Sequence, residues 1–133
     1  MTQEIKNLLD SIFKLGDWVN TYWIFYAVFN IAMIGWITSS PIAWNWEKRL
    51  FISFGYGLVV SVNLFAQYRT TRFMGLAIKE LKAMVAATEN VTRTEELKNE
   101  VINFRYIDTP LIIAVHLIMD VMVIVCIWLR GKF

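Results

Sequence analysis

Three long stretches of the chain carry almost no charge, and they determine the expected architecture. Residues 21–40 and 50–68 contain no Asp, Glu, Lys or Arg. Residues 110–130 are strongly apolar, apart from two ionisable side chains in the interior of the stretch and Arg130 at its end. About 20 mostly apolar residues suffice for a helix to cross the hydrocarbon core of a bilayer. The pattern therefore predicts three transmembrane helices.

The residues at the ends of these stretches are typical of a membrane boundary. Tyr22, Trp23 and Tyr26 lie near the start of the first stretch, and Trp36 lies near its end. Aromatic rings that carry a polar atom settle at the level of the lipid headgroups. Pro41 then ends the first helix, and Pro110 opens the third, where proline is favoured as a first helical residue.

Two polar segments have the periodicity of helices. Residues 1–17 are predicted to form an amphipathic helix that lies in the membrane interface, with packing on another protein as the alternative. Residues 69–108 are predicted to form a helical hairpin. We therefore expect an all-α integral membrane protein with one polytopic domain over 1–133. The recurring apolar residues are Ile5, Leu8, Leu9, Ile12 and Phe13 in the first segment and Phe73, Leu76, Ala77, Leu81, Met84 and Val85 in the second.

The distribution of basic residues predicts the orientation. Cytoplasmic loops are enriched in Lys and Arg, and more of these residues flank the end with the N-terminus and the hairpin. We expect the N-terminus and the hairpin in the cytoplasm and the C-terminus outside, in the inner membrane if the cell is bacterial. The basic residues counted are Lys6, Lys14, Arg69, Arg72, Lys79, Lys82 and Arg105 on the first side and Lys48, Arg49, Arg130 and Lys132 on the other.

The composition excludes several other classes of protein. Of the 133 residues, 57% are hydrophobic and only 18% are charged, which excludes a disordered chain. The mean hydropathy is +0.48. The single Cys126 excludes an intrachain disulfide and a cysteine-based zinc or iron–sulfur site. One histidine and a net charge of +2 argue against a nucleic-acid partner, so the expected partner is the lipid bilayer.

The third span carries two unusual residues, His116 and Asp120. They are four residues apart and therefore lie on the same face of a helix. Ionisable groups at mid-membrane cost about 2.5–3.5 kcal/mol each on insertion scales, and they are usually functional. One interpretation is a pair that handles protons or ions, in which the two side chains interact directly. The other is a polar contact that holds helices together.

The first two spans add polar residues at a similar depth. Asn30 lies near the middle of the first span. Several polar side chains recur at helical spacing along the second span and form a stripe on an otherwise apolar helix. The candidate pore or intramembrane polar residues are therefore His116, Asp120, Asn63, Asn30, Tyr56, Ser53 and Gln67.

The second span also carries a surface suited to close helix packing. Ser53, Gly57 and Ser61 are spaced four residues apart, and small residues at this spacing let another helix approach closely. We do not expect a thin bundle of three helices to hide an aspartate and a polar stripe from lipid. We therefore expect a homo-oligomer, in which further subunits supply the missing walls.

The sequence contains no motif for catalysis. It has no glycine-rich phosphate loop and no second histidine for a His-rich metal site. We expect no catalytic residue, no metal and no cofactor. His116 as an axial ligand of a haem, or His116 and Asp120 as ligands of a metal shared between subunits, are the alternatives.

These observations favour a small homo-oligomeric channel or membrane-permeability component over an enzyme. A non-catalytic accessory or anchor subunit of a larger membrane complex is the alternative, with a soluble cytoplasmic partner docked on the hairpin over 69–108. A small membrane enzyme ranks third.

Overall fold

The computed structural model describes residues 3–40, 44–87, 99, 101–104 and 109–130. Three helices account for nearly all of these residues, and the described part of the chain contains no strand: α1 is Gln3–Ser39, α2 is Trp46–Ala87 and α4 is Thr109–Leu129. Each helix contains a stretch long and apolar enough to cross a membrane. An all-helical chain with three candidate membrane spans is therefore confirmed.

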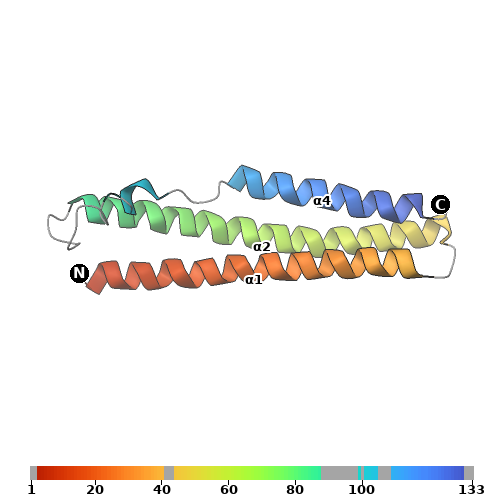
Figure 1. The fold of residues 1–133 in the computed structure, drawn as a ribbon, viewed down its shortest axis with the longest axis horizontal. Helices are drawn as coiled ribbons and strands as arrows, with labels where there is room; N and C mark the ends of the chain where they lie inside the picture. The colour runs from red at the N-terminus through yellow and green to blue at the C-terminus, as the bar shows by residue number, and fades with distance from the viewer. Residues whose placement is uncertain (1–2, 41–43, 88–98, 100, 105–108, 131–133) are drawn as a thin grey trace.

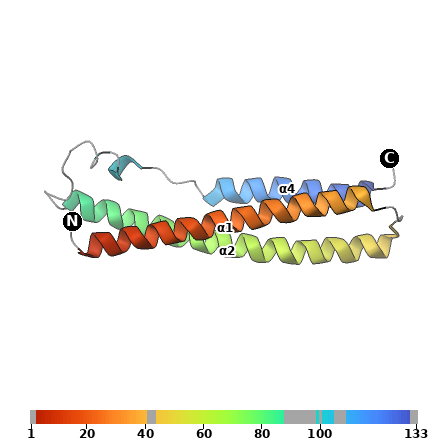
Figure 2. The ribbon, with the colours of Figure 1, turned by 60° about the horizontal axis from the view of Figure 1, so that its bottom comes forward.

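The three helices pack side by side in alternating directions. α2 runs antiparallel to α1 and α4, so one end of the bundle holds the ends of α1 and α4 and the start of α2 (Figure 1). α4 has 21 residues and α2 has 42, so α4 covers only part of α2. Beyond α4, residues 3–20 of α1 and 69–87 of α2 continue together (Figure 2). We refer to them as the two-helix extension and to the remainder as the three-helix part.

The buried side chains of α2 follow one another at intervals of three and four residues along most of the helix. This spacing keeps one stripe of a helix against its neighbour, as in left-handed coiled coils. It explains why α1 and α2 stay together over so great a length. The buried residues are Tyr56, Val60, Asn63, Gln67, Thr71, Met74, Ile78, Leu81 and Val85 in α2, and Ile5, Ile12, Val19, Tyr26, Asn30 and Ile37 in α1.

Two apolar cores hold the helices, one in each part. Between the two cores, the buried stripe of α2 consists of Asn63, Gln67 and Thr71, which we call the polar row. The buried stripe of α2 is therefore apolar at both ends and polar in between. The core of the three-helix part contains Tyr26, Ile37, Trp44, Tyr56, Val60, Val123 and Ile127, and that of the extension contains Ile5, Ile12, Met74, Ile78, Leu81 and Val85.

The N-terminal segment differs from the sequence-based prediction. The described residues of 1–17 are not a separate helix, because α1 continues from Gln3 to Ser39 without a break. Ile5 and Ile12 belong to the same apolar core as Met74 of α2, so α2 covers most of the stripe that was predicted to face lipid headgroups, while Phe13 stays exposed. An apolar stripe can be buried by a membrane interface or by another helix, and α2 offers a stripe of matching spacing.

The predicted hairpin over 69–108 is only partly described. α2 remains helical through residue 87, where the first arm of the hairpin was predicted. The turn and most of the second arm lie outside the described residues. Of that arm, residues 99 and 101–103 are helical, and the Lys82 ammonium donates a hydrogen bond to the backbone carbonyl of Phe104 over 2.6 Å.

The outward surface of the three-helix part is apolar, which is the arrangement that a bilayer requires. Large apolar side chains on all three helices are exposed, while the polar side chains of the spans point mostly inward. The exposed apolar residues include Ile24, Phe25, Val28 and Ile31 on α1, Phe51, Phe54, Leu58, Val62 and Phe65 on α2, and Leu117, Ile118, Val121, Met122 and Val125 on α4.

Two arginines close the end of the bundle where α1 and α4 finish. Arg49 donates to the backbone carbonyls of Trp128 and Arg130, each over 2.6 Å. Arg130 donates to the carbonyls of Ile37 and Ser40. The last carbonyls of a helix have no partner within the helix and form the negative end of its dipole, so cationic donors stabilise both helix ends.

Candidate functional site

Asp120 of α4 lies near the middle of the three-helix part and meets a tyrosine from each of the other two helices. The hydroxyl of Tyr26 on α1 donates to Asp120 Oδ1 over 2.7 Å. The hydroxyl of Tyr56 on α2 lies 2.9 Å from the same oxygen. A single carboxyl oxygen therefore connects all three helices.

Asn30 of α1 completes this group. Its Nδ2 donates to the backbone carbonyl of Tyr26 over 2.8 Å, which defines the orientation of the amide. Its Oδ1 lies 2.6 Å from the hydroxyl of Tyr56 and can only accept a hydrogen bond there. We refer to Tyr26, Asn30, Tyr56 and Asp120 as the Asp120 cluster.

The two tyrosine hydroxyls have fewer protons than there are oxygens around them. Tyr56 has one proton, and both Asn30 Oδ1 and Asp120 Oδ1 lie within 2.9 Å of its hydroxyl. Tyr26 has one proton, with Asp120 Oδ1 at 2.7 Å and the backbone carbonyl of His116 at 3.1 Å. The two hydroxyl protons therefore face three acceptor oxygens: Asn30 Oδ1, Asp120 Oδ1 and the backbone carbonyl of His116. Tyr56 can donate its proton to only one of its two neighbouring oxygens, so its contact with the other has no proton unless Asp120 supplies one.

His116 is fully buried next to the Asp120 cluster. Its Nδ1 lies 3.0 Å from the backbone carbonyl of Ile112 and donates to it, since a carbonyl only accepts. Its ring packs on Tyr26 and Trp23, with ring centroids 4.1 Å and 4.8 Å away. Among the described residues, His116 Nε2 has no hydrogen-bond partner. The expected direct contact with Asp120 is not found in this part of the chain; Tyr26 touches both side chains and connects them instead.

The polar row on α2 is buried and poorly satisfied. Asn63 Nδ2 donates to the backbone carbonyl of Tyr22 over 3.3 Å. The side-chain oxygen of Asn63, both polar atoms of the Gln67 amide and the Thr71 hydroxyl find no partner among the described residues. Buried polar atoms without partners are costly in proteins, and ordered water commonly satisfies them.

The register of the helices places the polar row on one side of the Asp120 cluster. Tyr56 meets Asp120, and α2 and α4 are antiparallel, so residues that follow Tyr56 lie alongside residues that precede Asp120. The polar row thus extends from the level of His116 towards the two-helix extension. Together these groups form a polar interior that reaches from mid-span to the start of α4.

The sequence identified most of this interior but missed two members. Ser53 is the only expected residue outside it; it is partly buried, and its hydroxyl has no partner within the described ranges. Tyr26 was assigned to the aromatic belt, although its position four residues before Asn30 places both on one helix face. Thr71 follows Gln67 at the same spacing and continues the row.

A single chain encloses most of these polar groups, since His116 and Gln67 are 0% exposed and Asn30 is 1% exposed. Polar side chains from three helices satisfy one another where they converge on one point, as Tyr26, Tyr56 and Asp120 do. Asp120 itself is only partly buried, so the homo-oligomer expected around it stays a prediction.

The described residues contain no group of three or more His, Cys, Asp or Glu side chains that could hold a metal ion. His116 is enclosed by Tyr26 and Trp23, and axial ligation of a haem would require these rings to move apart. Cys126 is partly buried and lies among the residues that pack on the core of the three-helix part.

Comparisons of the chain with protein-family models, with curated proteins and with solved structures found no match. The function is therefore argued from the residues of the site itself.

Proposed function

We propose that the protein is a small membrane-permeability component that passes protons, with a gated path inside its own three-helix bundle. The observation that carries this proposal is the Asp120 cluster. A carboxyl group, two phenol hydroxyls and an amide lie in hydrogen-bond contact at mid-span, surrounded by apolar side chains. Ionisable residues at such a depth mark proton and ion pathways in membrane proteins.

The count of protons in the cluster supports a protonated Asp120. The Asn30 amide is oriented by its bond to the Tyr26 carbonyl, so the proton of Tyr56 belongs on Asn30 Oδ1. The contact of 2.9 Å between Tyr56 and Asp120 then needs its proton from the carboxyl group. Asp120 is therefore the group that takes up and releases the transported proton.

The polar row gives protons a route to Asp120 from the side of the two-helix extension. Five buried atoms without described partners belong to His116 and to the polar row, on the extension side of Asp120. Each water needs two to four polar partners, and these atoms offer them. We propose that ordered waters occupy this region and carry protons between the extension side and Asp120.

An apolar layer closes the other side. Between Asp120 and the end formed by Arg49 and Arg130, the core consists mainly of apolar side chains such as Ile37, Val123 and Ile127. The hydroxyl of Ser53 is a buried polar atom on this side, and it has no partner among the described residues. Hydrophobic constrictions gate channels by excluding water. We propose that this layer is the gate, so the conformation described here is closed.

The proposed orientation places the N-terminus and the two-helix extension in the cytoplasm and the C-terminus outside. It rests on exposed basic side chains of the extension such as Lys14 and Lys79, since cytoplasmic flanks are rich in Lys and Arg. Arg49 and Arg130 at the other end are committed to backbone carbonyls of the bundle. In a bacterial cell the host membrane would be the inner membrane.

A polar substitution in the gate tests the proposal. Val123 is 0% exposed in the apolar layer, and Val123→Thr keeps its shape while adding a hydroxyl that attracts water. Val121→Thr is the matched control, because Val121 lies on the same helix and faces outward with 61% exposure. Liposomes that contain a pH-sensitive dye should acidify faster with Val123→Thr than with wild type or the control. Equal rates for all three proteins and for empty liposomes would contradict a proton path.

The two-helix extension favours a second candidate function, that of an accessory or anchor subunit with a soluble partner. Phe13 of the extension is exposed, and so are Ile102 and Phe104 of the short described segment that Lys82 of the extension contacts. Exposed apolar side chains of this kind suit a protein contact. This function would take precedence if Val123→Thr and wild type both leave liposomes as impermeable to protons as lipid alone.

A further inference from the structure

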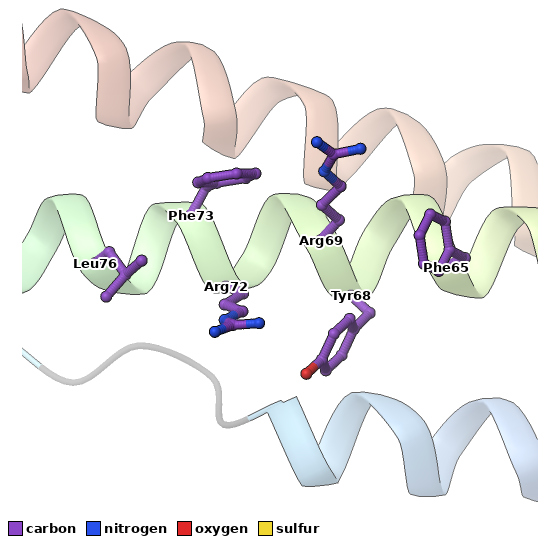
Figure 3. A pocket seen from close by; sticks show the side chains of 6 residues that line it. All are labelled: Phe65, Tyr68, Arg69, Arg72, Phe73 and Leu76. Atoms are coloured by element: carbon purple, nitrogen blue, oxygen red, sulfur yellow. The ribbon is translucent and has the colours of Figure 1, made fainter.

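Two adjoining hollows lie on α2 where the three-helix part passes into the extension. The first has a volume of about 430 Å³ and is lined by residues of α2 alone, as Figure 3 shows; we call it the basic hollow. Its lining combines aromatic rings with two arginines. The lining residues are Phe65, Tyr68, Arg69, Arg72, Phe73 and Leu76.

The two arginines of the basic hollow have no polar partner within the described part of the chain. Arg69 and Arg72 form no hydrogen bond or ion pair there, and Arg69 lies only over the ring of Phe73, 5.8 Å from its centre. Arg49 and Arg130, by contrast, each donate to several backbone carbonyls. Two guanidinium groups that flank one hollow form a site for an anion, because guanidinium matches the geometry of a phosphate group.

The second hollow leads from the first towards the middle of the span. It has a volume of about 280 Å³, and we call it the apolar groove. Phe65 and Tyr68 line both hollows, so the two share a wall. Ile113 of α4 also lines the apolar groove, together with Ser61 and Leu64 of α2. The groove therefore lies between α2 and α4 within the membrane-spanning part.

The basic hollow lies at the level that the sequence predicts for the lipid headgroups. The uncharged stretch of α2 ends at Tyr68, and Arg69 and Arg72 follow it directly. Tyrosine rings and the basic side chains at span ends lie at this level. In Figure 3, Tyr68 and Arg72 extend towards the α4 side of α2, and Arg69 extends towards α1, so charge borders the face from both sides.

We propose that the basic hollow and the apolar groove together bind one phospholipid with an anionic headgroup. Arg72 binds the phosphate, with Tyr68 beside it on the α4 side of α2, and Arg69 adds positive charge from the α1 side (Figure 3). An acyl chain lies in the groove against Phe65 and Ile113. The apolar groove is the feature that favours a lipid over a soluble anion as the ligand. A soluble phosphate or an acidic peptide would use the arginines but would gain nothing from an apolar channel that continues into the membrane.

Native mass spectrometry of the purified protein in mild detergent tests the charged half of the site. With equal amounts of phosphatidylglycerol and phosphatidylcholine added, the protein should retain mainly phosphatidylglycerol. One basic residue near an anionic lipid surface is worth about 1 kcal/mol, so Arg72→Gln should lower the preference about fivefold. Lys79→Gln is the matched control, because it removes the same charge from an exposed position of α2 outside the hollow. Equal retention of the two lipids by wild type, or equal effects of the two variants, would overturn the proposal.

Filling the groove tests the apolar half. Ile113→Trp places a large ring in the groove, and Ile118→Trp makes the same change on the outward surface of α4, where Ile118 is 63% exposed. Ile113→Trp should reduce retention of phosphatidylglycerol, and Ile118→Trp should not. Excess inorganic phosphate at constant ionic strength should not displace the lipid. Displacement by phosphate, together with no effect of Ile113→Trp, would identify a soluble anion as the ligand and reject a lipid. Circular dichroism of each variant establishes that it remains folded.

Discussion

Asp120→Asn is the substitution that separates the structural role of the cluster from its role with protons. The introduced amide has nearly the same shape as a carboxyl group. With its NH₂ group at the place of Oδ1, it donates one hydrogen to the hydroxyl of Tyr56 and one to that of Tyr26. Tyr56 then donates to Asn30, and Tyr26 donates to the backbone carbonyl of His116, 3.1 Å away. Every hydroxyl keeps a partner, so the bundle should retain its stability.

Asp120→Leu is the comparison that supplies the magnitude. It leaves Tyr56 with Asn30 alone and removes the contact of 2.7 Å that Tyr26 makes with Asp120. Hydrogen bonds between membrane helices are worth about 0.6–2 kcal/mol each, so the loss of two should lower the free energy of unfolding by about 1–4 kcal/mol. Asp120→Asn should stay within about 0.5 kcal/mol of wild type, as expected where no buried partner is lost.

Reversible unfolding in mixed micelles of mild detergent and sodium dodecyl sulfate measures both values. Infrared spectroscopy of protein with isotope-labelled aspartate adds a direct observation of the carboxyl group. Wild type should show the band of a protonated carboxylic acid at neutral pH, and Asp120→Asn should lack it. If Asp120→Asn destabilises the protein as much as Asp120→Leu, or if the wild-type band is absent, the proton count in the Asp120 cluster is refuted.

Two further predictions concern association and orientation. Gly57→Leu should weaken self-association in light scattering while Gly55→Leu does not, because only Gly57 belongs to the small-residue stripe. A Cβ atom at either glycine would have no described atom within 4 Å outside the nearby backbone of its own helix. A monomeric wild type in several mild detergents would contradict this prediction. In a Cys126→Ala background, Glu47→Cys should react with an impermeant thiol reagent in intact cells and Lys79→Cys should not, since both positions are exposed at opposite ends of α2. The reverse labelling would contradict the proposed orientation.

The spans were predictable because a bilayer imposes a minimum length on an uncharged run. Residues 21–40 and 110–130 meet that requirement from composition alone, and α1 and α4 contain nearly all of them. The place of Asp120 near the middle of α4 followed from the same argument. Which side chains it meets did not, because contacts depend on how each helix is rotated about its axis, and the sequence of one helix does not specify the rotation of its neighbours.

Tyr26 illustrates this limit. Its aromatic ring and hydroxyl suit the headgroup level, and a sequence-based reading assigns it there. In the structure it is 3% exposed and donates to Asp120, because α1 presents it on the stripe that also contains Asn30. The N-terminal segment shows the same limit of prediction from sequence. Ile5 and Ile12 mark an apolar stripe, but only the position of α2 decides whether lipid or protein covers it.

The central claim is that protons cross inside a single bundle by way of Asp120. The most direct measurement is the initial rate of proton entry into dye-loaded liposomes that carry increasing amounts of the Val123→Thr protein, with and without Asp120→Asn. Our account predicts a rate that rises in proportion to the amount of protein, as expected of one path per chain, and that falls to the rate of empty liposomes when Asp120→Asn is added. A rate that is unchanged by Asp120→Asn, or that rises much more steeply than the amount of protein, would contradict it.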